Sequence, residues 1–313
     1  MTAQIKLKHS GGNGVIIEAP ANNPASDKTI ALPSTESGVF ATKNSANSLQ
    51  NVTGINGGQL SNRNLIINGS QIIDQRNSGS AVTVSNASVT YVTDRFSLYE
   101  DTDGVISAQQ STTSPDGFTK SIKVDCTTVD TSLASSQRLV FEHRIEGNNI
   151  AHLGFGSSAA KTITLSFYVK SNLTGTFGGS IKNSDSNRVY IFSYSISSAN
   201  TWERKTITIA GDTSGTWLIT NGTGININWG LALGSDWVGS AGSWGTSDKH
   251  GVTGQLNLLS STDNEWLITG VQLEVGSTAT DFEHRSFAQE LALCQRYYQQ
   301  YTNIMSVGYV PDN

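Results

Sequence analysis

A glycine-rich segment at residues 234–250 holds the side chains best suited by type and spacing to bind a sugar. Its five candidate ligands are Trp237, Trp244, Asp236, Asp248 and His250. Aromatic rings offer flat apolar faces, and carboxylate and imidazole groups exchange hydrogen bonds with hydroxyl groups. The segment therefore predicts a glycan-binding loop. In the alternative interpretation, both tryptophans cover the open end of a sandwich or fill a subunit interface.

One pattern has the residue types of an esterase. Gly-Asp-Thr-Ser at 211–214, together with Asp281 and His284, is similar to the sequence elements of one esterase class. However, Thr213 stands at the nucleophile position, and the alternation of strands and helices that builds such a site is missing. The sequence therefore argues against acyl-transfer chemistry here.

Two pairs of carboxylates are candidates for a glycosidase, namely Glu142 with Glu146 and Asp281 with Glu283. Carboxylates this close in sequence more often form a solvated strand edge, so no residue is assigned a catalytic role. The tetrapeptide Phe-Glu-His-Arg occurs twice, at 141–144 and 282–285. Chance and paired edge strands are both adequate explanations of the repeat.

The sequence has no metal-site spacing. Its five histidines stand singly, without the spacing of a zinc site; they are His9, His143, His152, His250 and His284. Residues 101–104, Asp-Thr-Asp-Gly, offer oxygen ligands but lack the distal glutamate of a calcium loop, which favours a plain turn over a structural calcium site. No cofactor is expected.

Composition indicates an all-β protein. The 313 residues are rich in Ser, Thr, Asn and Gly, and only 14% are charged, which suits polar-faced strands and turns. A net charge of −5 gives no broad basic field, so nucleic-acid binding is not expected. No apolar run has the length of a membrane span, so the sequence predicts a soluble protein made in a cytoplasm.

Residues 1–63 differ in character from the rest. Ile5 and Leu7 alternate with lysines before a glycine-rich turn, and residues 15–17 return as a partner strand, which predicts a hairpin. Such a leader has little core of its own and would be more stable paired with other chains. Residues 42–63 are rich in Asn, Ser and Gly, which predicts a linker and a domain boundary near residue 63.

Short strand patterns separated by turns begin at residue 65 and predict a sandwich or jelly roll over residues 64–285. The expected strands are 65–67, 82–84, 91–92, 96–98, 122–124, 139–141, 162–169, 189–194, 205–209, 225–233, 254–259 and 266–275.

The end of the chain predicts one strand and one helix. Val271, Leu273 and Val275 alternate with Gln272 and Glu274, as in a strand that buries one face. Ser286 with Gln289 offers a capping box for a helix in residues 286–313. The apolar stripe expected on this helix consists of Phe287, Leu291, Cys294, Tyr298 and Tyr301.

The two cysteines each have a packing explanation. Cys126 lies in an alternating strand pattern and Cys294 on the helix stripe. A disulfide between them is the weaker alternative, because such bonds rarely persist in reducing cells.

Three motifs near the C-terminus carry a family resemblance: Gly-Val-Gln-Leu-Glu-Val-Gly at 270–276, Phe-Glu-His-Arg-Ser at 282–286 and Leu-Ala-Leu-Cys-Gln-Arg-Tyr-Tyr at 291–298. Together they resemble a family of bacteriophage tail-fibre and related virion proteins that is common in marine phages. Residues 64–69, 73–77 and 93–96 look like the opening of the same module. Residues 4–12 and 29–33 are similar to the leader of cyanophage-type fibre proteins.

The resemblance implies a jelly-roll β-sandwich like a carbohydrate-binding module, with an N-terminal hairpin leader and one C-terminal amphipathic helix. It implies a homotrimeric tail fibre or similar appendage, assembled in the host cytoplasm. Residues 1–63 would hold other virion proteins, and the sandwich would contact host polysaccharide. A purely architectural head or neck fibre or tail adaptor is the alternative, and a glycan esterase or depolymerase is the third.

Overall fold

The chain divides into two compact units, Met1–Val52 and Thr53–Asn313. In the computed structural model, residues 62–85 and 87–300 are described in full, and residues 4–8, 14–18, 42–43 and 49–50 by their backbone. In the first unit, β1 (Gln4–Lys8) and β2 (Gly14–Glu18) form the expected antiparallel hairpin, and β3 (Thr42–Lys43) pairs with β4 (Leu49–Gln50). Residues 29–33 of the expected leader and most of the linker expected at 42–63 lie outside the described residues.

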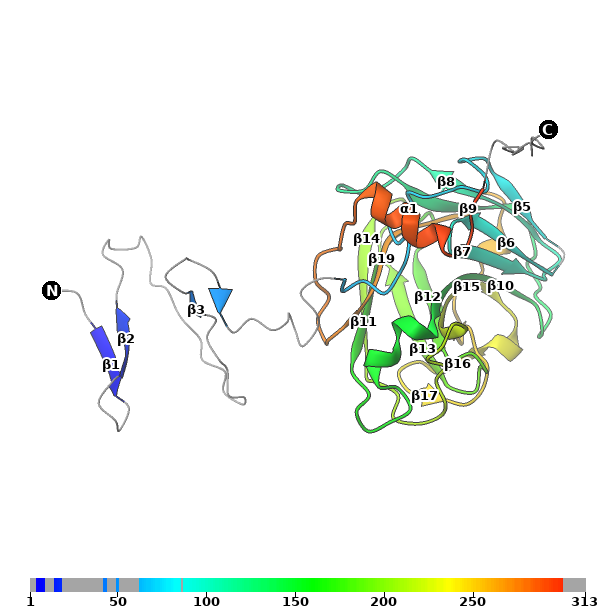
Figure 1. The fold of residues 1–313 in the computed structure, drawn as a ribbon. Coiled ribbons are helices and arrows are strands. Elements are labelled where there is room, and N and C mark those ends of the chain that lie inside the picture. Colours follow the sequence, from blue (N-terminus) through cyan, green and yellow to red (C-terminus); the bar gives the residue numbers. More distant parts are fainter. Residues whose placement is uncertain are drawn as a thin grey trace, which may run out of the picture. The chain divides into compact units, whose positions relative to one another are not determined.

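The second unit is a jelly-roll β-sandwich of two antiparallel sheets (Figure 1). The seven-stranded sheet has the order β17 (Trp244–Gly245), β13 (Val189–Ile196), β12 (Gly175–Lys182), β15 (Thr223–Leu233), β10 (Arg138–Glu146), β7 (Phe96–Glu100) and β6 (Ser88–Thr93). The six-stranded sheet has the order β14 (Glu203–Ile209), β11 (Ile163–Ser171), β19 (Glu265–Val275), β9 (Ser121–Thr128), β8 (Val105–Ser111) and β5 (Val82–Val84). The chain passes repeatedly from one sheet to the other, which confirms the predicted fold class.

Alternating side chains build the core between the two sheets. Phe141 of β10, Trp229 of β15 and Trp266 of β19 are fully buried, and the Phe141 ring centroid lies 5.5 Å from that of each tryptophan. Burying one large apolar side chain stabilises a fold by about 1.5–3 kcal/mol. Because side chains of a strand alternate between faces, the same strands present their polar residues to solvent on the opposite face.

Most strands lie where the sequence places them, but two predicted strands are absent and five described strands of the second unit were not predicted. The prediction of strands at 65–67 and 254–259 is wrong: the first segment runs along β19 without forming a ladder, and the second contains a turn and the 3₁₀ helix Leu258–Ser260. The strands that were not predicted are β8, β12 and three two-residue strands, Val238–Gly239, Trp244–Gly245 and Gly251–Val252. Strand β12 contains Gly175, Gly178 and Gly179, which weaken a strand signal.

The predicted strand at the end of the domain exists, but its predicted one-sided burial is wrong. Gln272 and Glu274 of β19 are 0% and 2% exposed. The segment that follows the strand folds back over this face: Gln272 Oε1 accepts a hydrogen bond from Glu283 N at 2.8 Å, and Glu274 accepts two from Thr280, at 2.8 Å from its amide and 2.7 Å from its hydroxyl. Polar groups on this strand are therefore buried and satisfied.

The helix α1 (Phe287–Gln295) begins at the predicted cap, where Ser286 Oγ accepts a hydrogen bond from Gln289 N at 3.3 Å. Its apolar stripe differs from the predicted one. Phe287 is 61% exposed, whereas Cys294 is buried beside Ile67 and Ile73 of the segment that opens the domain. Tyr298 lies beyond the end of the helix, and Tyr301 lies outside the described residues.

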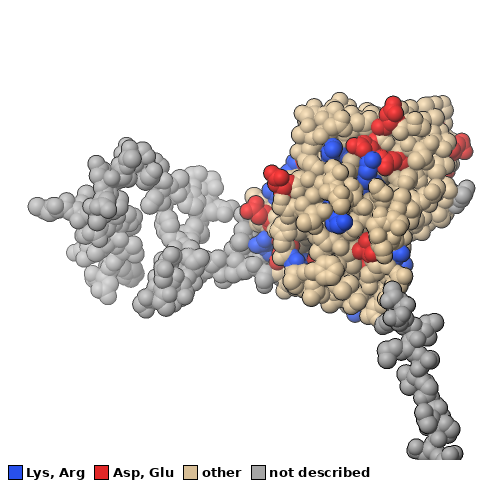
Figure 2. Space-filling model, turned by 90° about the horizontal axis from the view of Figure 1, so that it is seen from above, with Lys and Arg blue, Asp and Glu red and all other residues tan. Residues whose placement is uncertain are grey.

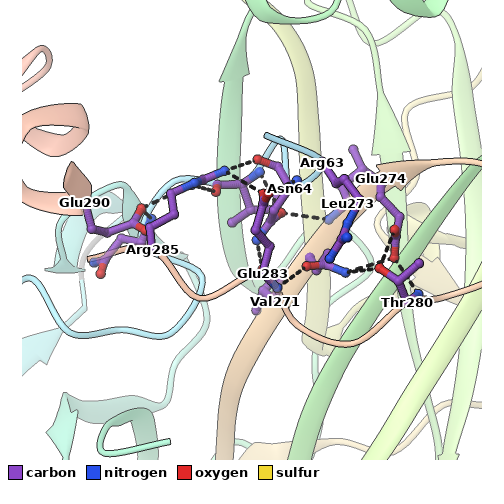
Figure 3. Close-up of polar contacts among 12 residues, drawn as sticks. Arg63, Asn64, Val271, Leu273, Glu274, Thr280, Glu283, Arg285 and Glu290 are labelled. Atoms are coloured by element: carbon purple, nitrogen blue, oxygen red, sulfur yellow. Dashed lines mark hydrogen bonds and ion pairs between the residues drawn. The ribbon is translucent and has the colours of Figure 1, made fainter. Parts of the chain in front are cut away.

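We call the polar cluster that joins the two ends of the domain the terminal clamp. It consists of Asn64, Gln272, Glu283, Arg285 and Glu290. Figure 3 shows Asn64, Glu283, Arg285 and Glu290 of this cluster. Asn64 uses its side chain as a substitute for strand pairing, since its Nδ2 donates to Val271 O at 3.1 Å and its Oδ1 accepts from Leu273 N at 3.1 Å.

Arg285 fastens the helix side of the clamp. Its guanidinium donates to Ile66 O at 2.9 Å and to Asn64 O, and it pairs with Glu290 at 3.4 Å. Residues of the segments 270–276 and 282–286 thus connect the two ends of the domain.

Both cysteines are buried free thiols, so the alternative of a disulfide is wrong. Burial raises the pKa of each thiol. Among the residues that the structure describes, no helix combines the length and the apolar composition of a membrane span.

Candidate functional site

The solvent-facing side of the seven-stranded sheet carries two rows of polar side chains set by strand register. In one row Ser97 of β7 stands opposite Glu142 of β10, which stands opposite Asn228 of β15 and, beyond it, Ser180 of β12. In the adjacent row Arg144, Asn226 and Lys182 follow one another across β10, β15 and β12. Residues opposite one another in neighbouring strands lie on the same face, so these side chains form one continuous polar surface.

A pocket of about 370 Å³ lies over these rows. Its floor consists of Val140, Glu142, Asn226 and Asn228, and Tyr99, Arg138 and Lys182 stand around them. Glu142 accepts hydrogen bonds from Ser97 Oγ at 3.1 Å and Asn226 Nδ2 at 3.3 Å. The Oδ1 atoms of Asn226 and Asn228 are buried and have no hydrogen-bond partner, so the floor retains hydrogen-bonding capacity.

The segment after η3 (Ser235–Trp237) forms one wall of the pocket. Strand β16 (Val238–Gly239) pairs with β18 (Gly251–Val252), and this turn lies directly on β12 because Gly178 has no side chain. A Cβ atom at Gly178 would stand 2.5 Å from Val252 N. The close approach brings Asp248 and His250 to the pocket, where Asp248 Oδ1 accepts from Lys182 Nζ at 2.7 Å.

His250 is buried and neutral. Burial, followed by the nearby charges of Lys182 and Arg138, holds its pKa well below the usual value. Its Nε2 lies 3.1 Å from Arg138 Nη1, which can only donate, so the ring proton belongs on Nδ1. That Nδ1 is buried without a partner. The pKa of Lys182 is lowered by burial, although Asp248 acts in the opposite direction.

Arg138 lies between two aromatic rings. Its guanidinium carbon is 3.8 Å from the ring centroid of Trp237 and 4.7 Å from that of Tyr99. Tyr99 is fixed in turn, because its hydroxyl donates to Asp101 Oδ2 at 3.1 Å. The stacking holds the planar fork of the guanidinium in one orientation beside the pocket.

A second pocket of about 260 Å³ continues the first along β10. The two share Arg144 and Thr223, and the second is completed by Arg95, Glu146 and Tyr297. Arg138 and Glu146 lie eight residues apart on β10, which corresponds to a length of roughly 26 Å in a strand. We call the two pockets together the sheet groove.

The five residues predicted to bind glycan do not all gather at the groove. Asp248 and His250 line it, and Trp237 supports it from behind through its contacts with Arg138 and His250. Asp236 is exposed and accepts a hydrogen bond from Ser135 Oγ at 2.9 Å, outside the groove. Trp244 lies outside the groove and packs its ring against Phe155, Tyr190 and Trp217.

The candidate catalytic pairs have other partners. Glu142 and Glu146 lie roughly 13 Å apart along β10, beyond the separation of roughly 5–10 Å that glycosidases use. Glu146 is engaged by Arg296, with Nε–Oε2 and Nη2–Oε1 distances of 2.9 and 2.6 Å, and by the Tyr297 hydroxyl at 2.7 Å. These contacts, led by the Arg296 hydrogen bonds, lower the pKa of Glu146 to about 2. Glu283 belongs to the terminal clamp, where it accepts from Asn64 N at 2.9 Å.

The esterase-like residues are likewise structural. Asp212 accepts two hydrogen bonds from Arg188, each 2.7 Å long, and one from Trp217 Nε1 at 3.3 Å. His284 packs its ring against Phe118 and Phe282. Within residues 62–85 and 87–300, no contact joins Asp212 to His284, and no three His, Cys, Asp or Glu side chains gather as metal ligands.

Sequence reasoning missed most groove residues, including Tyr99, Arg138, Arg144, Lys182, Asn226 and Asn228. The signal was present in the alternation of β10 and β15, where polar residues occupy every outward position of the sequences Arg-Leu-Val-Phe-Glu-His-Arg and Ile-Asn-Ile-Asn, apart from Val140. The sequence does not show the register of the strands in the seven-stranded sheet, and this register brings the polar rows together. Without the register, the loop with two tryptophans is the stronger sequence signal for a binding site.

No protein-family model matches the chain, and no curated protein matches it. Solved structures match weakly. The enzymatically active domain of bacteriophage CBA120 tailspike protein 4 aligns with 68% of this chain and 21% of its own, at 15% identity and a TM-score of 0.34. A family 4 carbohydrate-binding module aligns with 67% of this chain and 99% of its own, at 14% identity and a TM-score of 0.32.

A third similar structure, TmCBM61 in complex with β-1,4-galactotriose, aligns with 68% of this chain and 99% of its own, at 9% identity and a TM-score of 0.31. All three TM-scores lie below 0.5, so these proteins carry no argument about what the sheet groove binds. The chemistry of the groove is given by its own residues.

Proposed function

We propose that this protein is a bacteriophage virion component, a fibre or fibre-like appendage, that binds a host-surface glycan in the sheet groove. The observation that carries the proposal is the continuous groove across β10, lined by carboxylate, amide, guanidinium and ammonium groups that exchange hydrogen bonds with hydroxyl groups. Tyr99 adds aromatic surface at one end, and Trp237 holds Arg138 in place there. An open, elongated and polar site suits a chain of sugars better than an apolar ligand.

The virion role is supported by the motifs at 270–276, 282–286 and 291–298, which resemble phage fibre proteins. In this proposal residues 1–63 attach the protein to other virion proteins, and three copies associate. Three weak glycan sites on one particle would bind a repetitive surface far more tightly than one site. Binding, with no chemical step, is the proposed mechanism.

A steric block of the groove tests the proposal. Thr223 lines both pockets, so Thr223→Trp should fill their junction and abolish binding of the full chain to an array of bacterial surface polysaccharides. Thr206→Trp adds the same bulk to an exposed position of β14 in the other sheet and should leave binding intact. Equal binding by both variants would contradict the proposal, and no binding by the unaltered chain would favour a purely architectural protein.

A further inference from the structure

The sheet groove contains arginines that the protein leaves without a carboxylate partner. Of the charged groups that line it, Lys182 pairs with Asp248 at 2.7 Å, and Arg144 pairs with Glu142 at 2.9 Å. Glu146 pairs with Arg296 at 2.6 Å. Within residues 62–85 and 87–300, Arg95 and Arg138 form no ion pair with any carboxylate.

Both arginines are held in place by aromatic rings. Arg138 lies between Trp237 and Tyr99, and the guanidinium carbon of Arg95 is 3.6 Å from the ring centroid of Tyr297. The Nε atom of each is buried and has no hydrogen-bond partner. A guanidinium fixed in one plane loses little freedom when it binds an oxyanion, and its fork matches the two oxygens of a carboxylate or sulfate.

The turn between β6 and β7 fixes where the Arg95 side chain begins. Asp94 and Arg95 form a two-residue hairpin turn, and the φ of 73° at Arg95 is the left-handed conformation that such turns use. The Arg95 side chain donates to Arg144 O, so its guanidinium lies beside the end of the groove opposite Arg138.

Charge over the whole groove favours an anion. The lining contains four cations, Arg95, Arg138, Arg144 and Lys182, and three carboxylates, Glu142, Glu146 and Asp248, which gives a net charge of 4 − 3 = +1. The whole chain, by contrast, has a net charge of −5. Figure 2 shows sparse and intermixed charges on the face that it presents, with no large field of one sign. Any selectivity for an anion must therefore come from local groups.

We propose that the sheet groove binds an acidic polysaccharide, with Arg138 and Arg95 each donating to a carboxylate or sulfate group on sugars at opposite ends of the groove. This inference rests on the proposed glycan-binding function. The guanidinium of Arg95 reaches Arg144, and Arg144 and Arg138 lie six residues apart on β10, which corresponds to roughly 20 Å in a strand. The ligand is accordingly a chain with repeated charges, bound between the two arginines by hydrogen bonds to Glu142 and the asparagines.

The test compares charged and neutral polymers on the full chain. The probes are polygalacturonate, the same polymer after carboxyl reduction, dextran sulfate and dextran. We expect polygalacturonate or dextran sulfate to bind at least tenfold more tightly than its neutral counterpart, with the difference decreasing as salt is raised. The polymer that binds identifies the oxyanion as carboxylate or sulfate.

Variants assign the effect to the two arginines. Arg138→Gln and Arg95→Gln should each weaken binding of the acidic polymer about tenfold, and Arg138→Lys should weaken it less because charge remains while the planar fork is lost. Arg204→Gln removes the same charge from an exposed position on β14 and should change nothing.

Equal binding of acidic and neutral polymers, abolished by Thr223→Trp, would overturn this inference and leave glycan binding standing. No binding of any polymer would count against both.

Discussion

The same four residues, Phe-Glu-His-Arg, occupy two regions of this molecule and serve different ends. In residues 141–144 they lie in β10, with Glu142 and Arg144 facing the sheet groove, where Arg144 is 49% exposed. In residues 282–285 they lie in the terminal clamp, where the Arg285 side chain is only 8% exposed and contacts two backbone carbonyls and Glu290. The explanation by paired edge strands does not hold, because residues 282–285 form no strand.

The clamp and the groove differ in whether their buried polar atoms have hydrogen-bond partners within the protein. In the clamp, the buried polar groups of Asn64, Gln272 and Glu283 find partners within the protein, which stabilises a unique arrangement. In the groove, Asn226, Asn228, His250 and Arg138 retain atoms without partners. Buried polar groups are usually satisfied in folded proteins, and unsatisfied ones that line a pocket are able to bond a ligand or ordered water. Trp229 Nε1 and both ring nitrogens of His143 are also unsatisfied but lie in the core, so the position beside the pocket is what distinguishes the groove atoms.

Replacing Arg285 of the clamp and Arg144 of the groove should give the largest difference in the free energy of unfolding. Arg285→Met leaves Glu290 and two buried carbonyls without their cation, so the free energy of unfolding should fall by about 3–5 kcal/mol. Arg144→Met removes only a partly exposed ion pair and should lower it by less than about 1 kcal/mol. Urea unfolding of the full chain measures both, and equal losses would show that the clamp and the groove do not differ in this way.

The contact between Glu146 of the groove and Arg296 of the C-terminal segment should make the free energy of unfolding depend on pH. The hydrogen bonds from Arg296 lower the pKa of Glu146 to about 2 from 4.5, so this carboxylate stabilises the fold above pH 4.5 and loses that effect as pH falls towards 2. Glu146→Gln should therefore lower the free energy of unfolding by about 2 kcal/mol at pH 7. The difference from the unaltered chain should disappear near pH 2. A difference that is independent of pH would contradict this account of Glu146.

A smaller effect is expected from His143, the histidine of the repeated tetrapeptide that lies in β10. His143 is buried in the core, its ring centroid 4.5 Å from that of Phe96, and burial holds its pKa well below 6.5. Below pH 6.5 the unfolded chain binds a proton at His143 that the folded chain does not bind, so the free energy of unfolding decreases as pH falls. Between pH 7.5 and 5.5 this decrease amounts to about 1.4 kcal/mol, and it should be absent in His143→Phe.

A pH profile of unfolding that His143→Phe leaves unchanged would show that burial of His143 is not the cause.

Alternation and turn residues in the sequence were enough to predict the sandwich. They identify β10, β11, β15 and β19, because each strand buries one row of large apolar side chains. They fail for Gln272 and Glu274, whose burial depends on a segment that folds back over β19 and supplies hydrogen bonds from Thr280 and Glu283. Patterning along one strand does not contain that covering segment.

The groove was only partly predictable for the same reason. Asp248 and His250 stand in a loop whose composition indicates sugar binding, and both line the groove. The floor comes from strands whose neighbours in space are far apart in sequence, such as Glu142 and Asn228. Trp244 has the residue type of a sugar platform, but its ring is engaged by Trp217 and Tyr190, which only tertiary packing reveals.

A crystal structure of the full chain with an oligosaccharide from a polysaccharide that it binds tests the central claim most directly. The account predicts sugar rings along β10, with hydroxyl groups hydrogen-bonded to Glu142 and the asparagines and with the chain crossing the junction at Thr223. A sugar bound instead on the six-stranded sheet, or on Trp244 with the groove empty, would contradict it.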